Sequence, residues 1–145
     1  MSPEKLCQQI VENAPDAILF ADREGIIRLW NRGCELVFGF SAEEAIGQSL
    51  DLIIPERLRS RHWEGYHRVM ETGITRYGTE LLSVPAQHKD GRQLSCAFSI
   101  VMLKDEEGKL LGVASIMRDN TAAFDRDKAQ RKRIAELEAG QDSAN

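Results

Sequence analysis

The stretch "AILFADREGIIRLW", residues 17–30, decides how the chain is expected to fold. Two runs rich in apolar and β-branched side chains form its ends, and such runs favour extended strands. The residues between them, "DREG", include Asp22 and Gly25, which supply the side chain and the backbone freedom that tight turns use. We therefore predict a β-hairpin with strands at residues 17–21 and 26–30.

Helix signals flank this hairpin on both sides. Ser2 can cap a helix that has Pro3 in its first position. Apolar residues then recur at helical spacing at Leu6, Ile10 and Val11. After the hairpin, Asn31 can cap a helical turn, and Ser41 with Glu44 has the pattern of a capping box. The sequence thus predicts an amphipathic helix before the hairpin and a group of short helices after it.

A longer helix is predicted over residues 56–73, "ERLRSRHWEGYHRVMETG". Pro55 suits its first position, and Gly73 can adopt the left-handed conformation that ends helices. One face of this helix carries a stripe at helical spacing: Leu58, His62, Tyr66 and Val69. The stripe predicts that His62 faces the protein interior. His67 lies roughly 140° around the helix and is expected near its solvent side.

The chain after this helix has the pattern of three strands separated by turns. The strands are predicted at residues 76–87, 93–103 and 110–119. The inward face of the middle strand is expected to hold Leu94, Cys96, Phe98, Ile100 and Met102. Tight reversals at Asp90-Gly91 and residues 105–108 make these strands an antiparallel meander. The predicted fold class is α+β, an antiparallel sheet with the helices gathered on one face.

Length and charge restrict the functions that the chain can have. Its 145 residues, 42% of them hydrophobic, suit one compact domain with a short appendage. A net charge of -4 provides no basic field for nucleic acid, and no apolar run is long enough for a membrane span. The N-terminus lacks the pattern of a signal peptide. We therefore expect a soluble cytoplasmic protein that binds neither nucleic acid nor membrane.

Catalytic motifs do not stand out in the sequence. Cys7, Cys34 and Cys96 are widely spaced, which predicts reduced thiols rather than a disulfide framework or a metal site. The acidic pairs at residues 43–44 and 106–107 fall at a helix start and in a turn, where capping or solvated charge explains them. A phosphate loop, a metal-ligand cluster and a nucleophile motif are all absent from the sequence. We predict that the chain is not an enzyme.

The C-terminal residues form a separate predicted unit. We predict residues 1–121 as one domain including the first helix, and residues 122–145 as a helical extension rich in charge. Ile134 and Leu137 have coiled-coil spacing, but fewer than three heptads are present. The extension is therefore either a solvated tail or the seam of a dimer.

Several of these motifs, in this order, resemble the PAS family of sensory domains. The resemblance spans about residues 6–121 and is carried by "NAPDAI" at 13–18, "WN" at 30–31, "FGFSAEE" at 38–44, "KDG" at 89–91 and "RDNT" at 118–121. It implies a five-stranded sheet whose concave face, covered by the helices, encloses a small cavity. Family members use that cavity to sense ligands, redox state or light, or use the sheet to dimerise and relay signals.

His62 resembles the haem-ligating histidine of PAS oxygen sensors, namely rhizobial oxygen-sensor kinases and bacterial haem-regulated phosphodiesterases. In those proteins, as here from His62 to Gly73, the glycine that ends the helix lies eleven positions after the histidine, and the Lys-Asp-Gly turn follows. The resemblance implies haem as a cofactor and His62 as the axial ligand of its iron. A neutral imidazole in an apolar cavity is what such ligation requires.

The chain departs from these oxygen sensors at the next strand. They place an arginine there to hydrogen-bond the bound gas, and gapless counting from Gly73 puts Leu82 at that position. The distal side of a haem would then be largely apolar, or would offer a methionine to the iron. Its residues would be Leu82, Ile100, Val113 and Met117.

Two interpretations of the cavity stay open. The residues Tyr66, Val69, Phe98 and Ile100 either line a ligand pocket or fill the core, and His62 itself can be a packed core residue. We expect a sensory module that binds a small ligand or cofactor, with haem as the leading candidate. It would signal through a homodimer or its terminal helices to a separate effector protein. The alternative is a protein-protein interaction or dimerisation module with no cofactor.

Overall fold

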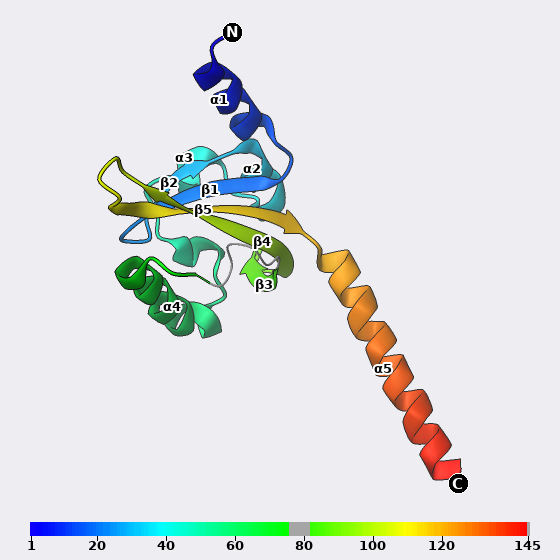
Figure 1. Ribbon diagram of the computed structural model, residues 1–145. Coiled ribbons are helices and arrows are strands. Elements are labelled where there is room, and N and C mark those ends of the chain that lie inside the picture. The colour runs from blue at the N-terminus through cyan, green and yellow to red at the C-terminus, as the bar shows by residue number, and fades with distance from the viewer. Residues whose placement is uncertain (76–81, 145) are drawn as a thin grey trace.

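The computed structural model describes residues 1–75 and 82–144 and has an α+β architecture built on a five-stranded antiparallel sheet. The strands are β1 (Ala17–Asp22), β2 (Ile27–Trp30), β3 (Leu82–Gln87), β4 (Gln93–Lys104) and β5 (Leu110–Asp119). Their order across the sheet is β2-β1-β5-β4-β3 (Figure 1). The predicted fold class is therefore confirmed. The part of the third predicted strand that falls on residues 76–81 lies outside the described residues.

The hairpin predicted from residues 17–30 forms as β1 and β2, which pair antiparallel. Asp22 organises its turn, because its Oδ1 accepts hydrogen bonds from the backbone N–H groups of Glu24 and Ile26, each at 3.0 Å. Gly25 has a φ of 78°, in the left-handed region that residues with a Cβ rarely adopt. Both residues that predicted the turn are therefore the ones that build it.

The sheet has one covered face and one exposed face. The covered face holds the most buried residues of β1 and β4: Ala17, Leu19, Ala21, Leu94 and Cys96. The other face carries apolar side chains that are 38% to 47% exposed: Val101, Leu103 and Ile116. Because side chains of a strand alternate between faces, this pattern places the core on one side of the sheet.

The helices are α1 (Pro3–Asn13), α2 (Arg32–Phe38), α3 (Ala42–Ala45), α4 (Arg59–Thr72) and α5 (Thr121–Ala144), with short 3-10 helices η1 (Leu50–Ile53) and η2 (Glu56–Leu58). The predicted caps are confirmed. Ser2 accepts from the N–H of Lys5, Asn31 caps α2, and Ser41 and Glu44 form a capping box. Local side-chain chemistry therefore sets where these helices begin.

The predicted start of the long helix is wrong, because α4 begins several residues after Pro55. Pro55 immediately precedes η2, and α4 begins only at Arg59, so the chain first makes a 3-10 turn. A 3-10 turn at a helix N-terminus is common, because it tightens the first hydrogen bonds. The predicted end is confirmed, since Gly73 follows α4 with a φ of 68°.

Asn31 joins four parts of the fold at one buried point. Its Oδ1 accepts hydrogen bonds from the N–H groups of Ile18 in β1, at 2.8 Å, and Cys34 in α2, at 2.9 Å. Its Nδ2 donates to carbonyl groups at the end of α1 and the start of β1, those of Val11, Ala14 and Asp16. At 4% exposure, the side chain has no access to water as a substitute partner.

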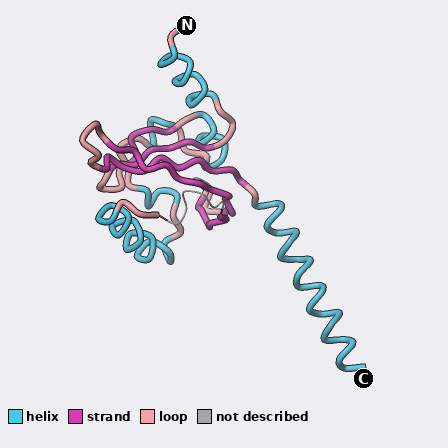
Figure 2. Tube along the Cα trace, in the orientation of Figure 1, coloured by secondary structure: helices cyan, strands magenta, loops and turns pink. Residues whose placement is uncertain are grey.

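The terminal helices project from the domain in different directions, as the tube in Figure 2 shows. α1 contributes no buried residue, and α5 continues away from the end of β5. The division into a domain at 1–121 and an extension at 122–145 stays a prediction. Within the described residues, no helix has the length and apolar character needed to cross a membrane.

The three cysteines are free thiols, as expected. Cys7 is exposed on α1, whereas Cys34 and Cys96 are buried in the core. Burial raises the pKa of both buried thiols to about 12, because the thiolate would lose its hydration there. These two side chains therefore act as small apolar groups at neutral pH.

Candidate functional site

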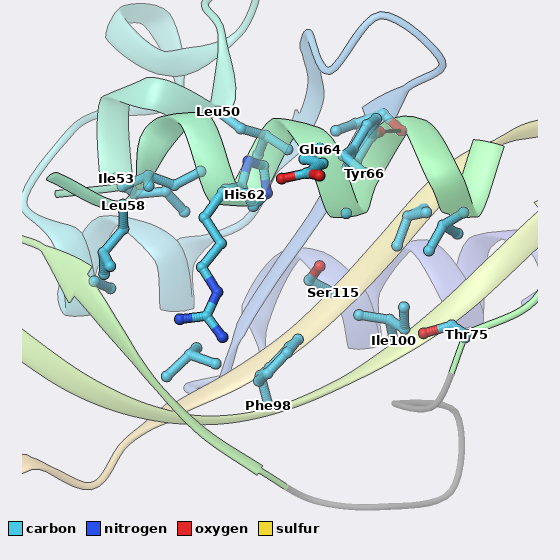
Figure 3. A pocket seen from close by; sticks show the side chains of 18 of the residues that line it. Leu50, Ile53, Leu58, His62, Glu64, Tyr66, Thr75, Phe98, Ile100 and Ser115 are labelled. Carbon is cyan, nitrogen blue, oxygen red and sulfur yellow. Dashed lines mark hydrogen bonds between the residues drawn. The ribbon is translucent and has the colours of Figure 1, made fainter. Parts of the chain in front are cut away.

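A pocket of about 770 Å³ lies between α4 and the covered face of the sheet. In Figure 3, His62 and Tyr66 come from α4 on one wall, while Phe98, Ile100 and Ser115 come from the sheet on the opposite wall. Leu50 and Ile53 of η1 close one end. The volume falls within the range of about 300–1,000 Å³ that small-molecule and cofactor pockets occupy.

Seven of the eight predicted site residues line this one pocket: His62, Tyr66, Val69, Phe98, Ile100, Val113 and Met117. The eighth, Leu82, lies on β3 with its backbone opposite Phe98, and its side chain lies outside the described part of the structure. Tyr66 and Val113 are buried, and the other five are half-buried around the hollow. The prediction that these residues bind a cofactor stays a prediction.

His62 is a half-buried imidazole without a hydrogen-bond partner among the described residues. Its Nδ1 is fully shielded from water. Burial lowers the pKa of His62 below its ordinary value, and the carboxylate of Asp51 only partly opposes that shift. The ring lies against two aromatic neighbours, with centroids 4.9 Å from Trp63 and 5.7 Å from Tyr66. His62 is thus a neutral side chain at neutral pH, as ligation of a metal would require.

Two neighbours on α4 hold His62 in this place. Trp63 donates from Nε1 to Oδ1 of Asp51 at 2.7 Å and packs so closely over Gly25 that a Cβ there would lie 2.1 Å from the indole ring. Tyr66 donates from its hydroxyl to the carbonyl of Asp22 in the hairpin turn. Burial raises the pKa of Tyr66 well above its ordinary value, so the hydroxyl keeps its proton. The hairpin turn therefore anchors the helix that carries His62.

His67 points away from the pocket, as predicted. It is exposed, and its ring centroid is 6.1 Å from that of Trp63. The two histidines of α4 therefore differ in environment, and only His62 lines the pocket.

Sequence reasoning missed the polar residues of the pocket. Those on α4 and just after it are Arg61, Glu64, Arg68 and Thr75. On the sheet wall the missed residue is Ser115, between Val113 and Met117 on the same face of β5. Alternation along the strand would have found it, because residues 113, 115 and 117 share a face. Helical periodicity could not distinguish the polar residues of α4 that line the pocket from charged residues that face solvent.

The residues present fit haem in most respects. A single neutral imidazole suffices as a protein ligand, so haem does not need the cluster of metal-binding side chains that is absent from the described residues. The sheet wall is apolar apart from Ser115. One feature of ligand histidines is missing: an acceptor for the second ring nitrogen, which normally fixes the tautomer. His62 would hold the iron, and the apolar sheet residues would face the ring.

Comparison with known proteins agrees with this geometry. The family model described as the PAS fold matches residues 11–123 of this chain. Sensor protein FixL of Bradyrhizobium diazoefficiens is 39% identical over 72 residues, covering 50% of this chain and 13% of FixL. Oxygen sensor protein DosP of Escherichia coli is 26% identical over 126 residues, covering 87% of this chain and 15% of DosP.

Among solved structures, the PAS domain of a Colwellia psychrerythraea protein superimposes with a TM-score of 0.73 at 26% identity. That match covers 83% of this chain and 99% of the Colwellia domain. The chain thus spans a small part of its curated relatives but nearly all of an isolated PAS domain. The family model, the strand order and the pocket under α4 lead to one assignment. This chain belongs to the PAS fold family of sensory domains.

Proposed function

We propose that this PAS domain is a haem-based sensor in which His62 binds the iron. The observation that carries the proposal is a neutral, unpartnered imidazole on the wall of an apolar pocket of about 770 Å³. Haem would supply an iron centre that binds small gases or changes redox state. Phe98, Ile100 and Val113 would exclude water from the sheet side of the pocket.

The comparisons support this choice among sensory functions. DosP is by name an oxygen sensor, and its similarity extends over the helix that carries His62. The whole-protein activities of DosP and FixL belong to much longer chains. What we transfer to this chain is the regulatory role of the domain, in the cytoplasm and without catalysis of its own.

We further propose that the output is a change of packing in a homodimer. The exposed sheet face offers Val101, Leu103 and Ile116, and α1 offers Leu6 and Ile10, all at least 38% exposed. A bound ligand can bias such packing only if it prefers one arrangement over another. A separate effector protein would read the change. Light scattering of the full chain and of residues 1–121 tests this output, because two identical monomer masses would contradict it.

A second candidate is a PAS interaction module that binds no haem. The observation that favours it is the missing acceptor for Nδ1 of His62, because metal-bound histidines nearly always donate their second N–H. In this case the pocket would hold a metabolite or stay filled with water, and the exposed sheet face would be the functional surface.

An absorption spectrum separates the two candidates. We expect haem-supplied wild-type protein to show a Soret band that His62→Ala abolishes, because the axial ligand is lost. His67→Ala is the matched control: it removes a histidine from the same helix but outside the pocket, so its band should equal that of the wild type. A featureless spectrum of the wild type, or an unchanged band in His62→Ala, would refute the haem proposal.

A further inference from the structure

Ser115 is a polar residue in an otherwise apolar wall. It lies in the middle of β5, paired with Leu19 of β1 and Ile100 of β4. Its neighbours on the same face, Val113 and Met117, are apolar and also line the pocket. In Figure 3 its hydroxyl oxygen lies on the side of the strand that faces α4. Ser115 therefore presents one hydroxyl to the hollow from the centre of the sheet.

Within the described residues, this hydroxyl has no structural role. Ser41 and Ser49 use their hydroxyls to cap helices, and Ser83 accepts a hydrogen bond from Asn120 at 2.9 Å. No hydrogen bond of the Ser115 side chain joins it to the described part of the chain, although the residue is half-buried. In the absence of a ligand, such a hydroxyl adds no hydrogen bond to the fold, so its removal should not destabilise the haem-free domain. A residue of this kind in a pocket is one that a ligand can satisfy.

We infer that Ser115 is the specificity-determining residue of the pocket, donating a hydrogen bond to an electronegative atom on the sheet side of the ligand. This inference rests on one part of the proposed function, namely that the pocket holds a ligand. The ligand class is a largely apolar body that carries a hydrogen-bond acceptor, because the sheet wall is apolar apart from Ser115. Because the surrounding sheet residues are apolar, this one bond decides which way such a body is oriented. If the pocket holds haem, Ser115 would supply a hydrogen-bond donor from the sheet wall, and donors of this kind influence gas binding.

The test uses two probes of equal shape, 2-acetylnaphthalene and 2-ethylnaphthalene. The ketone accepts a hydrogen bond and the ethyl compound does not, so their affinity ratio isolates that bond. The measured quantity is the affinity for the ketone divided by the affinity for the ethyl compound. We expect this ratio to be about threefold to tenfold larger in the full-length, haem-free wild type than in Ser115→Ala. Ser99→Ala is the matched control, because Ser99 lies on the outer face of the neighbouring strand, paired with Ile116. Its affinity ratio should equal that of the wild type.

Equal ratios in Ser115→Ala and the wild type would overturn the inference. Failure of the wild type to bind either probe would overturn it as well, because the pocket would then not admit an apolar body of this class. Thermal unfolding of the haem-free proteins adds a second readout: the midpoint of Ser115→Ala should not fall below that of the wild type. A lower midpoint would indicate a structural role for the hydroxyl and would contradict the inference.

The haem proposal and this inference fail in different ways. Ser115 is not an iron ligand, so Ser115→Ala should keep the Soret band of the haem-loaded protein. A wild type without that band refutes the haem proposal and leaves the naphthalene result as the test of Ser115. If the wild type binds haem but has the same ketone preference as Ser115→Ala, only the role of Ser115 is refuted.

Discussion

The two walls of the pocket are built in contrasting ways. On the sheet side, β5 is hydrogen-bonded along its length to β1 on one edge and to β4 on the other. Asn31 then ties β1 to α1 and α2 through a buried network. Such a wall cannot shift without breaking many cooperative contacts.

On the other side, α4 is attached mainly at its beginning. In the described part of the chain, its hydrogen bonds to other elements come from Arg59, Trp63 and Tyr66, all in the first eight residues of the helix. Tyr66 and Met70 are its buried residues. His62 lies among these attached residues, so a ligand that binds His62, as proposed, would act on α4 next to its anchor while the sheet stays intact. The difference between the walls suggests where sensing takes place.

The largest effect should come from the network of the sheet wall. Asn31→Ala removes partners from two backbone N–H groups and three carbonyl groups, in a site that water cannot reach. We expect a loss of about 3 kcal/mol in the free energy of unfolding, measured with urea. The control is Asn13→Ala, which removes only an exposed bond to Gln9 within α1. If both variants lose the same stability, the sheet wall does not depend on this network.

A change at the anchor of α4 should have the next largest effect. Gly25→Ala introduces a Cβ where Trp63 packs and also strains a backbone with a φ of 78°. We expect a loss of about 2 kcal/mol and a shift in tryptophan fluorescence, because the indole must move. Gly47→Ala separates the two causes, since its φ is 91° but nothing lies within 4 Å of its new Cβ. Unchanged fluorescence in Gly25→Ala would show that Trp63 does not anchor the helix.

Removing a single hydroxyl from the same anchor should cost less. Tyr66→Phe deletes the hydrogen bond to the carbonyl of Asp22 and keeps the aromatic packing. We expect a loss of about 1 kcal/mol in the free energy of unfolding, from chemical denaturation. Hydrogen exchange should increase in α4 more than in β5 if the helix is the less constrained wall. Equal increases in both elements would contradict the contrast between the walls.

The smallest effect concerns the protonation of His62. Its pKa is lowered in the folded state, so the unfolded chain binds more protons as the pH falls below about 6.5. The free energy of unfolding should therefore decrease from neutral pH down to the lowered pKa and then level off. We expect the decrease between pH 7.5 and 5.5 to be larger for the wild type than for His62→Gln, by no more than about 1 kcal/mol.

Urea unfolding at several pH values measures this difference directly. Every other side chain is the same in both proteins, so a difference between the two profiles comes from residue 62. Identical pH profiles would mean that His62 is hydrated in solution and that α4 lies farther from the sheet than in the structure. That result would remove the physical basis of the contrast between the two walls.

Much of the fold follows from signals between residues close in the chain. Asp22 with Gly25 predicted the hairpin, and Ser41 with Glu44 predicted a helix start, because turns and caps use partners a few positions away. The start of α4 was misplaced because a proline permits both a 3-10 turn and an α-helix after it. Ser115 shares the pocket face of β5 with Val113 and Met117, so strand alternation could have predicted its position although its side chain is polar.

Local chemistry thus predicted the order of the elements, their caps and turns, and the inward direction of His62, since each depends on neighbours along the chain. Only the folded arrangement reveals the pocket of about 770 Å³, the indole of Trp63 over Gly25, and an imidazole left without a partner. These features depend on how far apart two walls lie when residues distant in the sequence pack together. Spacing between elements arises from the sum of all packing contacts, and no short motif encodes that sum.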